Sequence, residues 1–547
     1  MRTAARPIAC LAVAAACALL FGLGATDLWA PDEPRYAAVA EELRSFRHGV
    51  SGLALLHLNG DAYTQKPPLY FWAAAILGAP CGAVTETVAR LPSALCGLAT
   101  VLLLAGFGAR LLGPTPGWLG GAVLLSAFEF IHRARRAQLD VMLTLFETLA
   151  LVAFWRLVRG QERRRLDLAV LHGALGLAVL TKGPVGFLVP VLVITATLAS
   201  EHRLRALRDL APPWALALSL GPGLVWTVAA LALAPEGTLS DAVGVNLFGR
   251  YLAGTSHARP FWYFLYQFPV SFLPWTLLWP LVAQVAVRRV FRPDGDPERR
   301  RAWRFLLLWI GVSFAFFTLS AGKRGLYLLP AFPAAALLCA DAVRDVLGGG
   351  RNMPIGLRRA LAATACALPL VAVAATIPAA AAGVDLPLRY GVLLATAATL
   401  ALLAWQRAAT RPDPGITRVV VVAAAVLAAE VITFTVAFPA LDAAKSPRPV
   451  AISAAALTPP GEAVGLASKA TLVGGLLYYG GRPVRTLDDS DAVKDFVRRG
   501  GRAIVVPEDR LGLVERGSPV AIHGRFRSGS RTLLVVTPSG EPRHLPD

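Results

Sequence analysis

Residues 91–111 read LPSALCGLATVLLLAGFGARL, an apolar run with one arginine near its end. About twenty such residues form a helix that crosses the roughly 30 Å hydrocarbon layer of a membrane. Similar runs recur throughout the 547 residues, which are 55% hydrophobic and 16% charged and have a mean hydropathy of +0.56. The sequence therefore predicts an all-α polytopic membrane protein and not a soluble enzyme.

Thirteen spans agree best with the distribution of arginines. They are predicted at residues 7–26, 91–111, 117–132, 140–156, 167–181, 184–200, 211–234, 269–287, 303–319, 325–343, 358–382, 387–406 and 417–438. Arg2 and Arg6 place the N-terminus in the cytoplasm, and this count leaves the arginine-dense connections there too. Residues 69–84 are left uncounted, because they are short, begin at a Pro-Pro pair and fit an interfacial or re-entrant segment.

The net charge of +19 does not indicate a nucleic-acid partner, since the arginines cluster in short connections between apolar runs. The six cysteines lie within or beside apolar runs, with neither a CxxC pair nor metal-ligand spacing, and are expected to be packing residues. Residues 1–26 could instead be a signal peptide, and its cleavage would leave the next loop on the same outer face.

The last hundred residues differ in character from the rest. Short apolar runs at 472–479, 503–507 and 532–537 alternate there with charges and glycine-rich turns. We therefore expect a transmembrane domain at residues 1–439 and a small soluble α/β domain at 440–547, which the thirteenth crossing places outside.

The first outer loop, about residues 27–68, carries the densest set of polar groups. It reads PDEPRY at 31–36 and QKPPLY at 65–70, and it includes Asp32, Glu33, Arg35, Tyr36 and Lys66. Polar groups beside a bilayer are costly and tend to serve a site. This loop is therefore the expected centre of the chemistry.

Further polar residues fall on the same predicted outer face. They are Arg133, Arg135, Arg136, Asp140, Lys182, Arg250, Tyr251, His257, Arg259, Lys323, Arg324 and Tyr327. Positive-inside statistics would keep basic residues out of short outer loops, so their presence indicates that an anion binds there. Phosphate is the natural candidate.

Sugar transfer from a lipid phosphate would use both signs of charge. A carboxylate, Asp32 or Asp140, could take the proton of the acceptor hydroxyl, while cations stabilise the departing phosphate. The candidates for the second role are Lys66, Arg259, Arg324 and Tyr327. The sequence contains neither a Walker A loop nor a dinucleotide fingerprint, which favours a lipid-linked donor.

Several short motifs occur in a characteristic order. They are DEPRY at 32–36, HLNG at 57–60, KPPLY at 66–70, ARLPS at 89–93, QLD at 138–140 and LTKGP at 180–184. Over about the first 340 residues the chain resembles the bacterial aminoarabinose-transferase branch of the GT-C membrane glycosyltransferases. Protein O-mannosyltransferases are more distant relatives.

The resemblance implies an inverting transferase in the bacterial inner membrane. It would move a sugar from undecaprenyl phosphate, or a similar polyprenyl phosphate, to a lipid A-like, glycan or protein acceptor on the periplasmic side. Asp32 matches the essential acid near the acceptor, and Asp140 matches a second important aspartate. Lys66 and Arg259 match ligands of the donor phosphate.

Tyr327 is a further candidate ligand, although the usual Pro-Thr does not precede it, and Glu33, Arg35 and Tyr36 are grouped with the substrate-binding residues.

In the aminoarabinose transferases a glutamate precedes the lysine and joins a histidine in a metal site. Here that position is Gln65, while His257 remains. A neutral amide is a poorer zinc ligand than a carboxylate. A divalent metal such as zinc at His257 is therefore a weak expectation.

Each candidate residue also has a structural alternative. Asp32 and Glu33 could cap a helix, and Asp140 could pair with Arg136 across one turn. Lys66 and Lys182 could be anchors at the headgroup level. A transporter or a noncatalytic scaffold would also be polytopic, although a transporter should carry ionisable residues within its spans.

Overall fold

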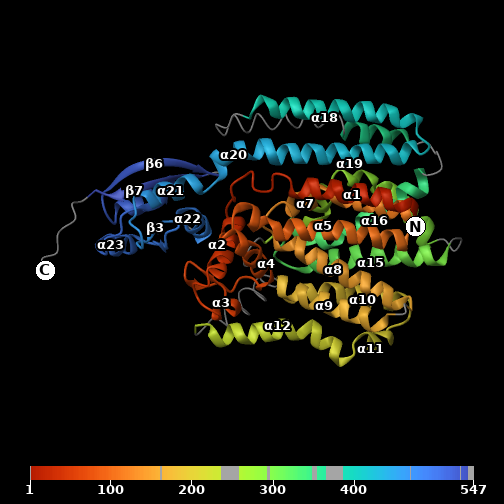
Figure 1. Ribbon diagram of the computed structural model, residues 1–547, viewed down its shortest axis with the longest axis horizontal. Coiled ribbons are helices and arrows are strands. Elements are labelled where there is room, and N and C mark those ends of the chain that lie inside the picture. The colour runs from red at the N-terminus through yellow and green to blue at the C-terminus, as the bar shows by residue number, and fades with distance from the viewer. Residues whose placement is uncertain are drawn as a thin grey trace.

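The computed structural model describes residues 2–160, 163–235, 258–291, 296–347, 354–364, 386–468, 470–529 and 531–539. Figure 1 shows a bundle of long, roughly parallel helices, with a smaller unit of helices and strands beyond one end. The first helix begins at the opposite end, and residues 27–68 lie between the bundle and the smaller unit.

The long helices of the bundle are α1 (Arg2–Leu20), α5 (Glu86–Leu111), α6 (Pro114–Leu125), α8 (Leu139–Val158), α9 (Arg164–Lys182), α10 (Val185–Ser200), α12 (Pro213–Leu233), α15 (Pro297–Leu319), α16 (Phe332–Leu347), α18 (Leu388–Arg407) and α19 (Pro414–Ile432). Among the described residues, seven helices are long and apolar enough to cross a membrane, or eight if a bent pair counts as one span. The chain is thus a multi-pass membrane protein.

Each predicted span overlaps a helix where the structure describes it, although residues 21–26 of the first span lie in turns after α1. The span at 117–132 covers α6 and the short helix α7 (Phe128–Ala134). The span at 269–287 falls on the bent pair, in which α13 (Tyr263–Ser271) meets the helical segment Trp275–Val290 at 104°. Most of the span at 358–382 lies outside the described residues. The count of thirteen therefore stays a prediction.

Short elements gather at the end of the bundle near the smaller unit. They are α2 (Asp32–Arg44), α3 (Ser51–Ala54), β1 (His57–Leu58), β2 (Asp61–Ala62), α4 (Leu69–Gly78) and the 3-10 turns η1 (Ala79–Cys81) and η5 (Gly325–Ala331). Strands β1 and β2 form an antiparallel pair. Helix α4 has ten residues, which is too short to cross a membrane.

The remaining helical segments of the bundle region are α11 (Ala206–Leu210), η3 (Trp275–Leu278), α14 (Trp279–Ala286), η4 (Val287–Phe291), η6 (Ala408–Thr410), η7 (Thr433–Ala437) and α20 (Phe438–Lys445).

Small residues allow the central helices to pack closely. Helix α5 begins at a Thr85 cap, whose side chain accepts a hydrogen bond from Val88 N. At Gly117 of α6 a Cβ atom would lie 2.6 Å from Ala105 O and 2.7 Å from Ala109 Cα of α5. Such contacts are typical of membrane helices, which associate through close packing.

The smaller unit contains a five-stranded sheet with helices beside it. Its elements are α21 (Arg448–Ala456), β3 (Val464–Leu466), η8 (Ala470–Leu472), α22 (Val473–Gly480), β4 (Val484–Thr486), α23 (Ser490–Arg498), β5 (Ile504–Pro507), η9 (Glu508–Arg510), α24 (Leu511–Glu515), β6 (Val520–Ser528) and β7 (Arg531–Pro538). The strand order is β4-β3-β5-β7-β6. Strand β3 is parallel to β4 and β5, whereas β7 is antiparallel to β5 and β6.

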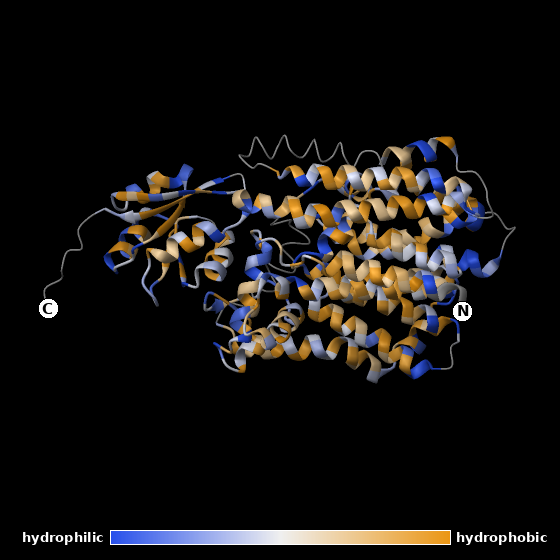
Figure 2. Ribbon diagram, turned by 45° about the horizontal axis from the view of Figure 1, so that its top comes forward, coloured by the Kyte–Doolittle hydropathy of each residue, from blue (hydrophilic) through white to orange (hydrophobic). Residues whose placement is uncertain are grey.

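Polar and apolar residues are separated along the bundle. Figure 2 shows apolar residues along the helices and hydrophilic ones toward their ends. Leu224, Val225 and Val228 of α12 are largely exposed, as expected of side chains that face lipid.

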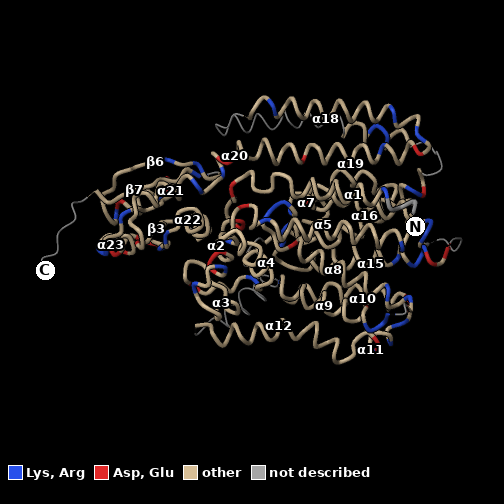
Figure 3. The backbone as a smooth tube through the Cα atoms, viewed as in Figure 1, with Lys and Arg blue, Asp and Glu red and all other residues tan. Residues whose placement is uncertain are grey.

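The two ends of the bundle differ in their charge. Figure 3 shows basic residues gathered at the end where α1 begins. The connections there are tied together by ion pairs such as Arg301 with Glu201 and Arg289 with Asp345. We call this the arginine end. The opposite end, which carries residues 27–68, is the loop end.

Candidate active site

Asp32 is the first residue of α2 at the loop end, and it is 9% exposed. Its Oδ1 accepts a hydrogen bond from Arg35 Nη2 at 2.5 Å, and its Oδ2 accepts one from Arg324 Nη2 at 3.2 Å. The residue before the helix is Pro31, which makes no side-chain cap. Asp32 is therefore a first-turn carboxylate held between two guanidinium groups, one from its own helix and one from the segment before η5.

Asp140 is the second residue of α8 and is 6% exposed. Its Oδ1 forms an ion pair with Lys182 Nζ, from the last turn of α9. The same Nζ lies 4.5 Å from the centroid of the Tyr327 ring. The partner of Asp140 is thus Lys182 and not Arg136, which pairs with Glu33 instead.

Arg324 is the group on which the fields of both aspartates act. Burial lowers the pKa of its guanidinium, but the Asp32 and Asp140 carboxylates outweigh this effect and raise the pKa above its usual value. The Arg324 side chain keeps 35% of its surface exposed. It therefore stays charged and accessible to a ligand beside two carboxylates.

The predicted phosphate ligands lie on segments that adjoin this centre. Gln65, next to Lys66, accepts a hydrogen bond from Arg35 Nη1 at 3.3 Å, and Lys66 is half-buried. Arg259 is exposed, and Lys323 Nζ donates to its carbonyl oxygen at 3.3 Å. A β-bridge between residues 258 and 322 therefore brings Arg259 beside the segment that ends at Arg324.

Tyr327, the weaker sequence candidate, packs against Phe317 at 5.6 Å between ring centroids as well as against Lys182. It is half-buried in η5. The structure thus brings Asp32, Arg35, Asp140, Lys182 and Arg324 together around the N-termini of α2 and α8, while Tyr327 covers Lys182.

Glu33 lies in a buried cluster, 2% exposed, and its bonds are made within the protein. Its carboxylate binds Arg90 Nε at 2.9 Å and Arg136 Nη1 at 3.0 Å, and it accepts the Ala137 amide at 3.0 Å. Burial would raise the pKa of Glu33, but Arg90 and Arg136 outweigh it and lower the pKa to about 2. This cluster joins α2, α5 and the segment before α8.

Tyr36 is a core residue, 4% exposed. Its ring packs at 6.0 Å from that of Tyr70 and at 5.5 Å from that of Phe71, both on α4. It therefore anchors α2 on α4, while Arg35 of the same turn lies over the Tyr36 ring. Of the substrate-binding group predicted from 33–36, only Arg35 directly contacts Asp32 among the described bonds.

Sequence reasoning missed two partners that the fold supplies. The sequence groups Lys182 with the outer cations or makes it a headgroup anchor, whereas the structure pairs it with Asp140. Arg90 belongs to the motif at 89–93 but has no predicted role of its own. In the structure it is 2% exposed and donates hydrogen bonds to Glu33 and to the carbonyl oxygens of residues 23, 26 and 27. A charge directly before the apolar run at 91–111 was the available signal, since a charge beside the membrane needs a partner.

The expectation of a divalent metal at His257 stays a prediction. Gln65 Oε1 is engaged by Arg35, and a neutral amide in contact with a cation is a poor zinc ligand. The described residues contain no group of three or more His, Cys, Asp or Glu placed to hold a metal ion. His257, with Arg250 and Tyr251, lies outside the described residues.

The sequence is similar to known membrane glycosyltransferases. It matches the family described as dolichyl-phosphate-mannose-protein mannosyltransferase over residues 65–227. It is 31% identical over 339 residues to an undecaprenyl phosphate-alpha-4-amino-4-deoxy-L-arabinose arabinosyl transferase of Pseudomonas savastanoi pv. phaseolicola, covering 61% of each chain. The enzyme of that name from Pseudomonas aeruginosa LESB58 is 32% identical over 343 residues, 60% of this chain and 58% of the relative.

Two solved structures share the fold. ArnT from Cupriavidus metallidurans bound to undecaprenyl phosphate matches with a TM-score of 0.75 at 21% identity, covering 96% of this chain and 97% of that chain. The archaeal oligosaccharyltransferase AglB from Archaeoglobus fulgidus matches with a TM-score of 0.51 at 13% identity, covering 93% and 69%. The chain therefore has the GT-C fold of ArnT, and the expected resemblance to the aminoarabinose transferases is confirmed over about three fifths of its length.

Proposed function

We propose that this chain is an integral-membrane glycosyltransferase that moves a sugar from a polyprenyl-phosphate donor to an acceptor at the loop end. The observation that carries the proposal is the position of Arg324 beside two buried aspartates, Asp32 and Asp140. A carboxylate that could take a proton and a cation that could bind a phosphate therefore lie in one cluster, which supports transfer from a lipid phosphate.

The proposed reaction is a single displacement with inversion. The acceptor oxygen forms a bond to the anomeric carbon of the sugar, and the bond from that carbon to the phosphate oxygen breaks with its electron pair. The acceptor hydroxyl gives its proton to a carboxylate oxygen of Asp32, and the polyprenyl phosphate leaves as the anion. Asp32 is suited to this role because it is held in place by Arg35 and Arg324 but is not fully buried.

The cations around Asp32 would divide the remaining work. Arg324 and Arg259 would bind the phosphate, Arg259 because it is exposed beside the Arg324 segment. Lys66 is proposed as a further phosphate ligand, since it follows Gln65, which accepts a hydrogen bond from Arg35. Asp140 would hold Lys182 and support the field at Arg324. None of these steps passes through a metal ion.

A cleft lies beside the residue that precedes Asp32, and we propose that the acceptor approaches through it. It has a volume of about 540 Å³ and is lined by Trp29, Pro31, Lys445 and Arg531, among others. Pro31 directly precedes Asp32, and Lys445 lies over the Trp29 ring at 4.6 Å. Aromatic and basic lining suits a sugar that carries an anionic group.

The relatives suggest which substrates to try first. Their names point to undecaprenyl phosphate-α-4-amino-4-deoxy-L-arabinose as the donor, and a lipid A-like molecule, a glycan or a protein is proposed as the acceptor.

We also propose that the protein lies in the bacterial inner membrane with its arginine end in the cytoplasm, since positive loops face inward. The smaller unit would then be periplasmic.

One observation keeps a transporter as the second candidate. Glu147 lies on α8, two turns from Asp140, fully buried, and neither of its carboxyl oxygens has a hydrogen-bond partner among the described residues. Ionisable residues within membrane helices mark transport pathways in many proteins. A noncatalytic relative that keeps the fold is the other alternative.

The deciding experiment compares wild type with Asp32→Asn. Each protein is purified in detergent and incubated with a panel of polyprenyl-phosphate sugars and a membrane extract, and released polyprenyl phosphate and acceptor glycosylation are followed by mass spectrometry. We expect the wild type to transfer a sugar and Asp32→Asn to lose at least about a hundredfold in rate, because the amide cannot take the proton.

Asp61→Asn is the matched control, because Asp61 is exposed on β2 of the same loop region. Its rate should equal that of the wild type. Equal transfer by Asp32→Asn would overturn the catalytic assignment. Donor movement across a proteoliposome membrane without release of polyprenyl phosphate would favour the transporter.

A further inference from the structure

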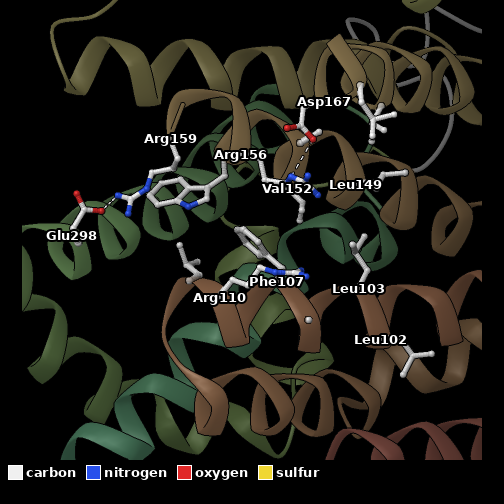
Figure 4. Close-up of a pocket in the computed structure, with 16 residues that line it drawn as sticks. Leu102, Leu103, Phe107, Arg110, Leu149, Val152, Arg156, Arg159, Asp167 and Glu298 are labelled. Carbon is white, nitrogen blue, oxygen red and sulfur yellow. Dashed lines mark ion pairs between the residues drawn. The ribbon is translucent and has the colours of Figure 1, made fainter. Parts of the chain in front are cut away.

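A second cavity lies at the arginine end, far along the bundle from Asp32. It is a groove of about 550 Å³ between α5, α8 and α9, with Glu298 of α15 at its edge. Figure 4 shows arginines at one end of this groove and leucines toward the other. The proposed transfer reaction uses none of these residues.

The mouth of the groove carries an excess of positive charge. Arg156 Nε is 3.0 Å from Asp167 Oδ1, and Arg159 forms an ion pair with Glu298. Arg110, the third arginine of the lining, is exposed and makes no ion pair with any residue that the structure describes. Two carboxylates therefore face three guanidinium groups, and one positive charge is left over at the surface.

The rest of the groove is apolar and runs along the helices. Leu102 and Leu103 of α5 lie about 12 Å and about 10 Å from Arg110 along the helix axis, at 1.5 Å per residue. Leu149 lies about 10 Å from Arg156 along α8 by the same measure. Phe107 and Val152 line the space between them. The groove thus offers a basic end followed by more than two turns of apolar wall.

Glycine makes this space open. Gly106 of α5 lines the groove, and a Cβ atom built on it would meet no atom within 4 Å. A side chain at this position can therefore start into the groove without a clash at its Cβ atom. This gives a variant that blocks the groove and leaves the bundle intact.

We infer that this groove binds one anionic phospholipid of the surrounding leaflet, with its phosphate at Arg110, Arg156 and Arg159 and an acyl chain along Leu102, Leu103 and Leu149. The charge excess at the mouth complements a phosphate, and basic pockets between membrane helices at this level bind anionic headgroups. The apolar wall matches an acyl chain and not a soluble anion. The inference does not depend on the proposed transferase activity.

The test is native mass spectrometry of the full chain released from nanodiscs. These contain phosphatidylglycerol and phosphatidylethanolamine in equal amounts, with a small fraction of undecaprenyl phosphate. We expect wild type to retain phosphatidylglycerol in preference to phosphatidylethanolamine. Arg110→Gln should lower the retained phosphatidylglycerol about fivefold, the effect of one basic residue at a membrane surface. Gly106→Leu should reduce it further, since the leucine fills the groove.

Gly311→Leu on α15 is the matched control, because Gly311 is also an open helical glycine but does not line the groove. It should retain phosphatidylglycerol as wild type does. The inference is overturned if wild type shows no preference for phosphatidylglycerol over phosphatidylethanolamine. It is also overturned if Gly106→Leu and Gly311→Leu retain equal amounts of phosphatidylglycerol. It is overturned as well if Gly106→Leu loses undecaprenyl phosphate and not phosphatidylglycerol, since the occupant would then be the polyprenyl lipid.

Discussion

Lys182 and Asp140 form an ion pair between the end of α9 and the start of α8. If Asp140 acts through this pair, Lys182→Gln should lower turnover about tenfold, because removing one partner leaves the other charge buried. The double variant Asp140→Asn with Lys182→Gln should be no slower than the slower single variant. Initial rates of polyprenyl phosphate release measure all three.

Lys494→Gln is the control, since Lys494 pairs with Asp491 on the exposed helix α23. Multiplicative losses in the double variant would show that Lys182 and Asp140 act separately.

Glu33 gives the protein an acid-sensitive cluster. Its pKa is lowered from the usual 4.5 to about 2 by Arg90 and Arg136, which outweigh burial. Because the pKa of Glu33 is lower in the folded than in the unfolded protein, the ionised carboxylate stabilises the folded state at any pH above about 4.5. This stabilisation is lost as the pH falls from about 4.5 toward 2. This shift corresponds to about 3 kcal/mol at pH 7. Wild type should therefore lose thermal stability steeply below about pH 5.

In the Glu33→Gln variant the unfolding midpoint should be lower than that of the wild type at pH 7, and it should change less as the pH falls from about 4.5 toward 2, because the titrating group is gone. Removing one partner of a buried pair costs about 3–5 kcal/mol. Thermal unfolding in detergent measures it, with Glu462→Gln, on the exposed surface, as the control. An unchanged pH slope in Glu33→Gln would assign the acid sensitivity to other groups.

At the residue scale, the sequence indicates which charged residues belong to the site but not which of them form ion pairs with each other. Asp32, Asp140 and Arg324 were selected because acids and cations recur in outer loops, and the structure brings them together. The partners of Glu33 could not be read, since Arg90 and Arg136 are 57 and 103 residues away. The packing of α2 against α5 and the segment before α8 decides which acid is buried and which stays accessible.

The contact of α5 with α6 tests packing at the scale of an element. Gly117→Ala would place a Cβ atom 2.6 Å from Ala105 O, so one helix must move away. We expect a lower unfolding midpoint, for a cost of about 1–3 kcal/mol as in other overpacked cores. Gly391→Ala on α18, where no atom lies within 4 Å, should not lower it. Equal midpoints would mean that the helices tolerate the wider spacing.

Hydropathy predicted the helices well because length and apolar content dictate them. It could not predict the 104° bend between Tyr263–Ser271 and Trp275–Val290, since the apolar run continues across it. The short helix α4 was anticipated because the Pro-Pro pair at 67–68 limits where it begins. Packing against neighbouring helices sets the direction and tilt of a helix, so these cannot be predicted from the apolar pattern alone.

The smaller unit is joined to the loop end by specific bonds. Asn59 Nδ2 donates to Val484 O at 2.7 Å, and Val484 N donates to Asn59 Oδ1 at 2.8 Å. Tyr478 donates to Val84 O, and Leu28 N donates to Tyr479. The sequence pattern predicted strands in this region but no contact with the first loop, because 425 residues separate Asn59 from Val484. The smaller unit therefore supports the loop that carries Asp32.

Gly474 of α22 joins that support to the site, because it packs directly on Arg35. A Cβ atom on it would lie 2.5 Å from Arg35 Cα and 2.8 Å from Arg35 N, so Gly474→Ala must push α2 or α22 away. Because Arg35 holds Asp32, the displacement should lower turnover about tenfold, as small misplacements of reacting groups do. Gly512→Ala on α24, whose nearest atom is 3.9 Å away at the end of Arg516, should leave turnover unchanged. If Gly474→Ala is folded and equally active, the smaller unit does not position Asp32.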